Sequence, residues 1–423
     1  MPADLLDPSA IQTGRLANGT SWAIWPDRRD AVATLQIWVS VGSRDEVPGK
    51  TGLAHMLEHL MFRGSRSVPD GEFDQRMESL GAQINAATWL DFTYYTATAH
   101  AGALPEVLRL EADRFEHLLV TEPVFKTERD VVANERRHVV ESDPEALLAE
   151  RFYQRIFGES CYGWPTIGWA NDIANYRGDD AMRFYAEGYA PSRLLVAVAG
   201  AVEVDELVPL LEATFGCIPG RETVRPERTT RLAASFSDSM KLAFAAPRML
   251  IGWPTGGRAS GDFATWCLLQ ELLDGGESAL LPAELMIRDK LALDVSASLY
   301  EHALPAVFEL AVTLRTGVTA AQARDAIGRV LRRLADQGPD RDELDAARTR
   351  LRTRDAVSLS GTYARAEQLG ESWIVFGDAK TGLDLPRRIA AVDAAMVRDL
   401  ARRIVEESPR YELIGLPLDE AAE

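Results

Sequence analysis

Two histidines and a glutamate form the pattern H-x-x-E-H within Gly52–Ser65, GLAHMLEHLMFRGS. The apolar residues of this segment recur at helical spacing, which predicts a helix. In a helix, His55 and His59 project from one face one turn apart, and two imidazoles placed in this way can bind one metal ion. Glu58 then lies close enough to act as the general base for a water molecule on that ion. The pattern therefore predicts hydrolytic metal chemistry, for which a third ligand is needed.

A second helix, expected over Thr121–Val140, carries candidates for the third ligand. Glu128 and Glu135 are seven residues apart and share a face. That face also carries a stripe of valines, namely Val124, Val131, Val132 and Val139. A carboxylate among valines is costly unless it is paired or bound to a metal, which favours a ligand. The alternative is a solvated helix face, which is common for helices with several glutamates.

These two segments together resemble the pitrilysin/insulinase family of inverted zincins, especially its half-length members similar to mitochondrial processing peptidase and bacterial relatives. In that family a glutamate about 76 residues after the motif completes the ligand set, and Glu135 is 76 residues after His59. The resemblance implies one zinc ion per chain, held by His55, His59 and Glu135, with Glu58 as the catalytic base. Glu128 matches a second family glutamate that supports the ligands.

The segment Gly81–Thr98, GAQINAATWLDFTYYTAT, is expected to contact the substrate. Its residue types alternate along the chain, and it is rich in threonine and aromatic residues, which predicts a β-hairpin. The resemblance implies an exposed edge strand beside the metal, formed by Asn85, Ala86, Ala87 and Thr88. An extended peptide can add to such an edge as a further strand. An ordinary sheet edge without a binding role is the alternative.

The segment Ser278–Val295, SALLPAELMIRDKLALDV, resembles a family segment whose Arg and Tyr reach the substrate carbonyl. Arg288 matches the Arg and is a candidate substrate-binding residue, but Val295 stands where the Tyr is expected, and Ala292 replaces a glycine. Valine cannot donate a hydrogen bond to a developing oxyanion. Tyr300 is expected on the other face of the strand. We therefore expect a homologous second subunit that supplies Arg and Tyr, or a homodimer in its absence.

The order of the expected elements divides the chain into two halves of similar plan. Residues 1–217 are expected to form the zinc-binding half, 218–236 a polar linker, and 237–423 a second half without metal. A strand is expected over Leu242–Ile251 in the second half. Strands followed by runs of helices predict an α+β class. The resemblance implies two related halves, each an antiparallel-rich sheet with helices packed on it, facing each other around a cleft.

Composition limits the partners and the compartment. The hydrophobic fraction of 46% is that of a globular protein, and the net charge of −18 argues against nucleic acid and anionic membranes as partners. The longest uncharged apolar run, Leu194–Val202, is too short to cross a bilayer. The first residues, MPADLLDPSAIQTG, do not resemble a signal peptide, so a cytoplasmic location is expected, or a periplasmic one if a signal was removed.

The remaining histidines and the cysteines offer no second site. Neither a disulfide framework nor a cysteine zinc site is expected from the three cysteines, because they are odd in number and lack a C-x-x-C pair: Cys161, Cys217 and Cys267. Three histidines have no partner at ligand spacing and are expected on the surface or at caps, namely His100, His117 and His138, and the only histidine after residue 138 is His302.

The expected function is that of a zinc-dependent endopeptidase acting on extended peptides or unfolded segments. Two alternatives remain open. One is a catalytically silent interaction subunit, although such family members usually lose motif residues and this chain keeps all four. The other is a zinc hydrolase of non-peptide esters or amides, which the edge-strand segment argues against.

Overall fold

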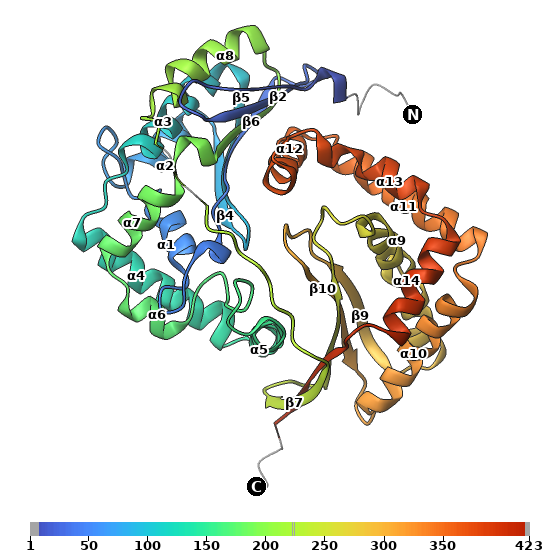
Figure 1. Cartoon of the computed structure of the whole chain (residues 1–423). Helices are drawn as coiled ribbons and strands as arrows, with labels where there is room; N and C mark the ends of the chain where they lie inside the picture. The colour runs from blue at the N-terminus through green and yellow to red at the C-terminus, as the bar shows by residue number, and fades with distance from the viewer. Residues whose placement is uncertain (1–7, 222, 224, 419–423) are drawn as a thin grey trace. The chain divides into compact units, whose positions relative to one another are not determined.

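A computed structural model describes residues 8–221, 223 and 225–418, and its elements form two compact units (Figure 1). Unit 1 comprises the chain up to Arg137, then Trp164–Arg228, and finally Ala356–Leu383. Unit 2 comprises His138–Gly163, Thr229–Asp355 and the chain from Asp384 onward. Each unit therefore combines segments from both halves of the sequence.

Unit 1 is built on a six-stranded sheet in the order β1-β2-β6-β3-β5-β4. The strands are β1 (Gln12–Arg15), β2 (Ser21–Pro26), β3 (Val32–Val39), β4 (Gln83–Thr88), β5 (Thr93–His100) and β6 (Leu194–Gly200). Strands β2 and β6 run parallel, and the other neighbours are antiparallel. In the centre of the sheet, Ile37 pairs with both Tyr95 and Val196. Strand β4 pairs with β5 alone and forms an edge of the sheet.

Helices cover both faces of this sheet. As a result, β3 is buried on both of its faces beyond Val32. The helices are α1 (Leu53–Leu60), α2 (Glu72–Ser79), α3 (Leu104–His117), α4 (Glu122–Arg136), α6 (Ala170–Asn175), α7 (Gly178–Gly188), α8 (Val204–Ala213) and α12 (Thr362–Phe376). On one face the ring of Tyr95 packs edge-on against Phe115 of α3 at 5.3 Å. On the other face Trp38 packs with Ala366 and Leu369 of α12.

Unit 2 has a five-stranded sheet in the order β7-β11-β8-β10-β9. The strands are β7 (Phe236–Leu242), β8 (Arg248–Thr255), β9 (Ala292–Leu299), β10 (Ala306–Leu314) and β11 (Tyr411–Pro417). Its helices are α5 (Pro144–Phe157), α9 (Phe263–Asp274), a π-helical segment (Pro282–Arg288), α10 (Ala320–Gln337), α11 (Arg341–Ser358), α13 (Leu385–Ala391) and α14 (Ala394–Glu406). Only β7 and β11 are parallel among the neighbouring pairs of this sheet.

The α+β class and the two similar halves are confirmed. The linear division at 217 and 237 remains a prediction about the sequence, and the compact units differ from it by an exchange of segments. Helix α12, from the second half of the sequence, packs on β3 and β6 of unit 1, whereas α5, from the first half, packs on β11 of unit 2. This exchange follows from the apolar character of both sheet faces, since each sheet needs a cover on its second face.

Two strand predictions need correction. The strand expected over Leu242–Ile251 is wrong, because this range holds the last residue of β7, a turn, and the start of β8. Pro247 lies at the end of that turn and has no N–H to donate to a sheet ladder. Strands β1 and β7 were not predicted at all. No helix in the described part of the chain is long and apolar enough to span a membrane.

Candidate metal centre and active site

Helix α1 carries the H-x-x-E-H motif, and its amphipathic pattern determines which residues face the site. Leu53, Met56, Leu57 and Leu60 are buried on one face. The helix begins after Gly52, whose φ of +89° is a left-handed conformation that favours glycine. A Cβ at Gly52 would lie 2.4 Å from the carbonyl oxygen of Ile167. Glycine is thus required at position 52 for both the turn and the close approach. Helix α1 lies beside β4 and α4 (Figure 1).

The structure brings His55, His59 and Glu135 together. One ligand atom from each lies within 4.8 Å of the others, and this is the only such group of three or more among the described residues. His55 Nε2 is 3.7 Å from Glu135 Oε1, and His59 Nε2 is 3.4 Å from Glu135 Oε2. Two ligand atoms about 2.1 Å from one tetrahedral zinc ion are roughly 3.4 Å apart. The measured separations are therefore close to those of a zinc site.

The chemistry of these three groups also fits zinc. Two imidazole nitrogens and one carboxylate oxygen form a ligand set that leaves a fourth tetrahedral position open, as in catalytic zinc sites. The side chains of His55 and His59 are 14% and 22% exposed, so the group is accessible only in part. Nδ1 of His55 is buried and has no hydrogen-bond partner, whereas Nε2 faces Glu135. The three residues thus present a partly buried, convergent donor set.

Glu128 lies behind His59. Its carboxylate is 3.4 Å from His59 Nδ1 and 2.7 Å from Arg63 Nη2, and its side chain is only 2% exposed. Burial acts to raise the pKa of Glu128, but the hydrogen bond with His59 and the charge of Arg63 outweigh it, so the pKa is lowered. Glu128 is thus an anion that orients His59. Arg63 was missed from the sequence; it lies four residues after His59, in the turn that follows the end of α1 at Leu60.

The two histidines differ in their protonation. Burial and the neighbouring charge of His59 lower the pKa of His55 to about 4. Burial also acts to lower the pKa of His59, but hydrogen bonds with Glu128 and Glu135 raise it to about 9. The hydrogen bond from His59 in turn lowers the pKa of Glu135. Without metal, His55 is therefore neutral at pH 7 and His59 carries the proton that a cation would displace.

Glu58 is held by a residue of the edge strand. Thr88 Oγ1 donates a hydrogen bond of 2.6 Å to Glu58 Oε2. Burial raises the pKa of Glu58, and the Thr88 hydrogen bond opposes that rise. A carboxylate with a raised pKa is suited to accept a proton near neutral pH. The contact between Thr88 and Glu58 was not predicted, since Thr88 was assigned only to the substrate strand.

The other members of the expected substrate strand also lie on β4. Asn85 is exposed, while Ala86, Ala87 and Thr88 are half-buried. Asn85 is opposite Thr96 of β5, and the other side of β4 has no strand neighbour. The hairpin and the edge position are as expected, and the role in binding peptides stays a prediction.

The valine stripe on α4 was interpreted incorrectly. Val131 and Val139 are 40% and 46% exposed, so they do not form a buried surface around the glutamates. Of the four valines only Val132 is buried, and together with Phe125 it makes the buried apolar contacts of α4. The burial of Glu128 comes from this packing and from its partners on α1, and not from a continuous stripe of valines.

Arg288 and Val295 belong to unit 2, whereas the residues of the metal site belong to unit 1. Arg288 is 61% exposed and is ion-paired with Glu284 and Asp289. Val295 is 5% exposed within the core of unit 2 and pairs with Val312 of β10. Tyr300 follows β9, and its ring is stacked on His302 at 5.6 Å. A substrate role for Arg288 stays a prediction.

The other histidines and the cysteines do not join the metal site. His138 and His100 are exposed, and His100 Nδ1 accepts a hydrogen bond from the backbone of Gly102. His117 is paired with Asp113, and His302 packs on Tyr162. The three cysteines are free thiols: Cys161, Cys217 and Cys267.

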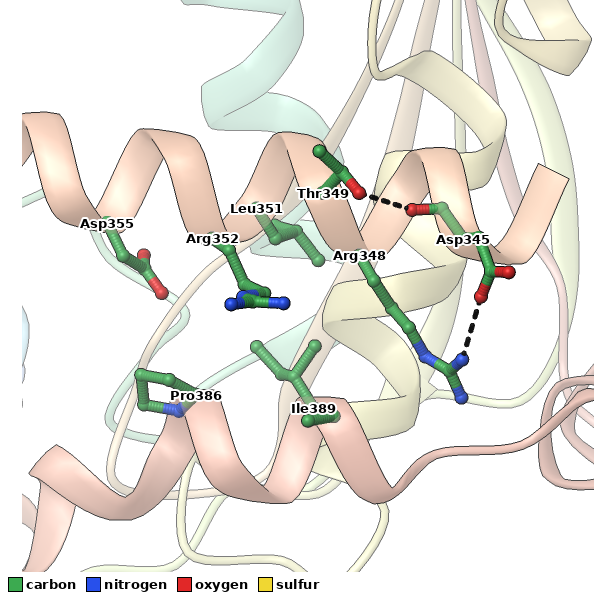
Figure 2. Close-up of a pocket in the computed structure, with 9 residues that line it drawn as sticks. Asp345, Arg348, Thr349, Leu351, Arg352, Asp355, Pro386 and Ile389 are labelled. Carbon is green, nitrogen blue, oxygen red and sulfur yellow. Dashed lines mark hydrogen bonds and ion pairs between the residues drawn. The ribbon is translucent and has the colours of Figure 1, made fainter. Parts of the chain in front are cut away.

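A cavity of about 390 Å³ lies elsewhere, between α11 and α13 of unit 2. Figure 2 shows Arg348 paired with Asp345 on α11, and Pro386 and Ile389 on the facing helix α13. Its lining contains neither histidine nor cysteine and none of the predicted site residues. The candidate site is therefore the cluster on α1, α4 and β4.

Comparisons with known proteins indicate the family of this chain. A sequence model described as insulinase (peptidase family M16) matches residues 23–168, and one described as the peptidase M16 inactive domain matches residues 177–351. An uncharacterised zinc protease of Streptomyces coelicolor is 28% identical over 92% of this chain and 86% of its own length. The zinc protease PqqE of Helicobacter pylori is 31% identical over 66% of this chain and 64% of its own length.

Two solved structures share the fold. A protease from Helicobacter pylori has a TM-score of 0.90 at 24% identity and covers 96% of this chain and 99% of its own. A Pseudomonas fluorescens protein described as a peptidase M16 inactive domain has a TM-score of 0.87 at 16% identity, with 98% and 99% covered. The chain is thus an α+β protein of two similar units with a group of two histidines and a glutamate that could hold a metal ion. The chain belongs to the insulinase family, peptidase family M16.

Proposed function

We propose that this protein is a zinc-dependent endopeptidase that cleaves extended peptides or unfolded segments of proteins. The observation that carries this proposal is the convergence of His55, His59 and Glu135 beside Glu58, which Thr88 holds from an edge strand. The relatives are named as zinc proteases, and these names support the same class of reaction. Because residues 177–351 match a model described as the peptidase M16 inactive domain, the proposal needs a direct test of activity.

His55, His59 and Glu135 would hold the zinc ion, and Glu128 would fix the orientation of His59 through Nδ1. When bound, zinc supplies Lewis acidity that polarises a carbonyl and lowers the pKa of water. Glu58 accepts the proton of the attacking water on Oε1, the oxygen that Thr88 leaves free, and then delivers it to the leaving amine. The protein's own residues thus provide both proton transfers.

The edge strand β4 gives the proposal its substrate class. An edge strand offers N–H and C=O groups that an extended backbone can pair with, whereas folded substrates cannot present such a backbone. Asn85 to Thr88 would align the peptide. Thr88 connects that strand to Glu58, the proposed base, by a hydrogen bond. We therefore propose peptides and unfolded segments as substrates, and this favours a peptidase over an esterase.

A second subunit is part of the proposal. Val295 is buried in the core of unit 2 and has no hydroxyl, so it cannot donate a hydrogen bond to an oxyanion. Loss of one such donor costs on the order of a hundredfold in turnover. A homologous subunit with an intact Arg and Tyr pair would supply what this chain lacks, and a homodimer is the arrangement expected without it. Turnover that rises on mixing with such a homologue would support this division.

A silent interaction subunit is the competing function, and it is disfavoured because all four motif residues are present and convergent. The deciding experiment measures bound zinc and peptide cleavage for the wild type and for Glu58→Gln. The amide keeps the shape of the side chain but cannot accept the proton, so zinc near one per chain should persist while cleavage is lost. Zinc near zero after uptake, or a Gln variant as active as wild type, would contradict the proposal.

A further inference from the structure

The linker after α8 carries two arginines, Arg225 and Arg228, that bind loops next to the proposed active site. Arg225 forms a bidentate pair with Asp45, with Nε–Oδ1 and Nη2–Oδ2 distances of 3.0 and 2.9 Å. Its Nη2 also donates to the carbonyl of Asp91 at 3.1 Å. Arg228 Nη2 donates to the carbonyls of Asp45 and Glu46, both at 3.1 Å. These contacts lie immediately before the chain passes into unit 2 at Thr229.

The first of the bound loops leads into the metal-binding helix. Glu46 is 2% exposed, and its two carboxylate oxygens accept hydrogen bonds from the backbone N–H groups of Gly52 and Ala54, both at 2.8 Å. Those N–H groups belong to the start of α1, where the backbone donors have no partner within the helix. His55 follows Ala54 directly. The placement of α1 is therefore set by Glu46, and Arg228 holds the backbone of Glu46.

The second loop follows the strand that carries Thr88. The carbonyls of Trp89 and Leu90 accept hydrogen bonds from the N–H groups of Ser43 and Arg44, at 3.1 and 2.9 Å. Asp91, next in sequence, is the residue whose carbonyl Arg225 binds. The loop that precedes α1 and the loop that follows β4 are thus joined to each other by backbone hydrogen bonds. Arg225 also bridges the two loops, because it binds the carboxylate of Asp45 and the carbonyl of Asp91.

We propose that Arg225 and Arg228 are positioning residues that set the placement of Glu58 relative to Thr88. This inference rests on the proposed function, in which Glu58 is the base. Arg225 and Arg228 both bind the loop that leads into the helix of Glu58, and Arg225 also binds the loop that follows the strand of Thr88. These two segments meet at the Glu58–Thr88 hydrogen bond. Bidentate arginine–carboxylate pairs fix direction as well as distance, and the side chain of Asp45 is only 5% exposed, which keeps solvent from screening the pair. A linker between the units thus fixes the geometry of the catalytic base.

The test compares Arg225→Gln with Arg221→Gln. Arg221 is on the same linker, but it donates to the carbonyl of Tyr189 and lies over the ring of Tyr185, so the control removes an equal charge from another surface of unit 1. Arg225→Gln should lower kcat by about 10- to 100-fold, because misplacing a catalytic group by about 1 Å has an effect of this size. KM should change by less than about threefold, because β4 keeps its full pairing with β5. Zinc content should be unchanged in both variants.

Hydrogen exchange on the metal-free proteins gives a readout that is independent of activity. The amides of Ser43, Arg44, Gly52 and Ala54 should exchange faster in Arg225→Gln and at the wild-type rate in Arg221→Gln, with the rest of unit 1 unaffected. Arg225→Lys keeps the charge but not the bidentate geometry, so it should recover only part of kcat. If Arg225→Gln does not fold, Arg228→Gln removes only the bonds to two carbonyls and serves as the second variant.

The outcomes separate the two proposals. An active wild type whose kcat is unchanged in folded Arg225→Gln and Arg228→Gln would overturn the positioning role while leaving the proposed function intact. A uniform rise in exchange across unit 1, with kcat falling only in proportion to the folded fraction, would also overturn it, since that is a general structural effect. A wild type without zinc or cleavage refutes the proposed function itself.

Discussion

The hydroxyl of Thr88 on the edge strand β4 donates a hydrogen bond of 2.6 Å to Glu58 on helix α1. Burial raises the pKa of Glu58, and this hydrogen bond acts in the opposite direction. A residue assigned to peptide alignment therefore also controls the basicity of the proposed general base. The strand that would receive the substrate and the group that would activate water are connected by one hydrogen bond.

Replacing Thr88 by valine should shift the acid limb of the pH–rate profile. Without the donor, the pKa of Glu58 rises further, and the base becomes protonated at a higher pH. A hydrogen bond to a charged group contributes about 1.5 kcal/mol, which corresponds to roughly one pH unit. The limb of kcat/KM should therefore move to higher pH by about that amount in Thr88→Val. Thr98→Val, whose hydroxyl bonds Thr34 instead, should leave the profile in place.

Zinc binding at pH 7 should release about one proton from His59. The pKa of His59 is raised to about 9 in the metal-free protein, so the side chain is protonated at neutral pH and must lose that proton to bind a metal. Calorimetric titration in buffers of different ionisation enthalpy measures this release. The release should disappear as the pH rises through about 9. In Glu128→Gln it should disappear at lower pH, because a neutral amide does not raise the pKa of His59 as a carboxylate does.

Asp27 should contribute to stability at neutral pH and not in strong acid. The hydrogen bond from Arg29, with the charge of Arg365 on α12, lowers the pKa of Asp27 from 3.8 to about 2. Since the folded pKa lies below the unfolded one, the contribution is full above about pH 4 and is lost as the pH falls through about 2. Because the pair is partly exposed, Asp27→Asn should cost on the order of 1 kcal/mol at pH 7. Urea unfolding at several pH values, with exposed Asp30→Asn as control, measures this difference.

Gly370→Ala should destabilise unit 1. A Cβ at Gly370 of α12 would lie 1.9 Å from the indole of Trp38 on β3, so the helix or the ring must shift. Overpacking of this kind costs about 1–3 kcal/mol. Gly361→Ala, at the start of the same helix, meets no atom within 4 Å and is the matched control. Equal midpoints of thermal unfolding for both variants would argue against a tight contact between α12 and this sheet.

The helix carrying the motif could be predicted because its chemistry is local. His55, Glu58 and His59 lie on one short amphipathic helix, so their relative positions follow from helical geometry alone. Glu135 is on another helix, and its spacing from the motif became informative only through the family resemblance. Arg63 and the Thr88–Glu58 contact could not be derived with the same certainty, since they depend on how α4 and β4 pack against α1.

Long-range packing explains most of what the sequence did not predict. Nothing in the local pattern of Thr362–Phe376 indicates that this helix covers the sheet of the other sequence half, because an apolar helix face does not identify its partner. Strand β7 was missed because none of its residues is buried, so it lacks a regular apolar face. The buried cluster around Asp45 was also invisible, since its arginines come from a linker about 180 residues further along the chain.

The exchange of segments has a consequence for the growing polypeptide. Domains that are continuous in sequence can fold as soon as they leave the ribosome, beginning with the N-terminal one. The candidate metal ligands of unit 1 lie within the first third of the chain and the strands of its sheet end at Gly200, yet one face of that sheet is covered by α12 of the segment Ala356–Leu383. The N-terminal half therefore keeps one apolar face of its sheet uncovered until α12 has been translated. The residues of the candidate metal site are thus synthesised well before the helix that covers the Trp38 face of their sheet.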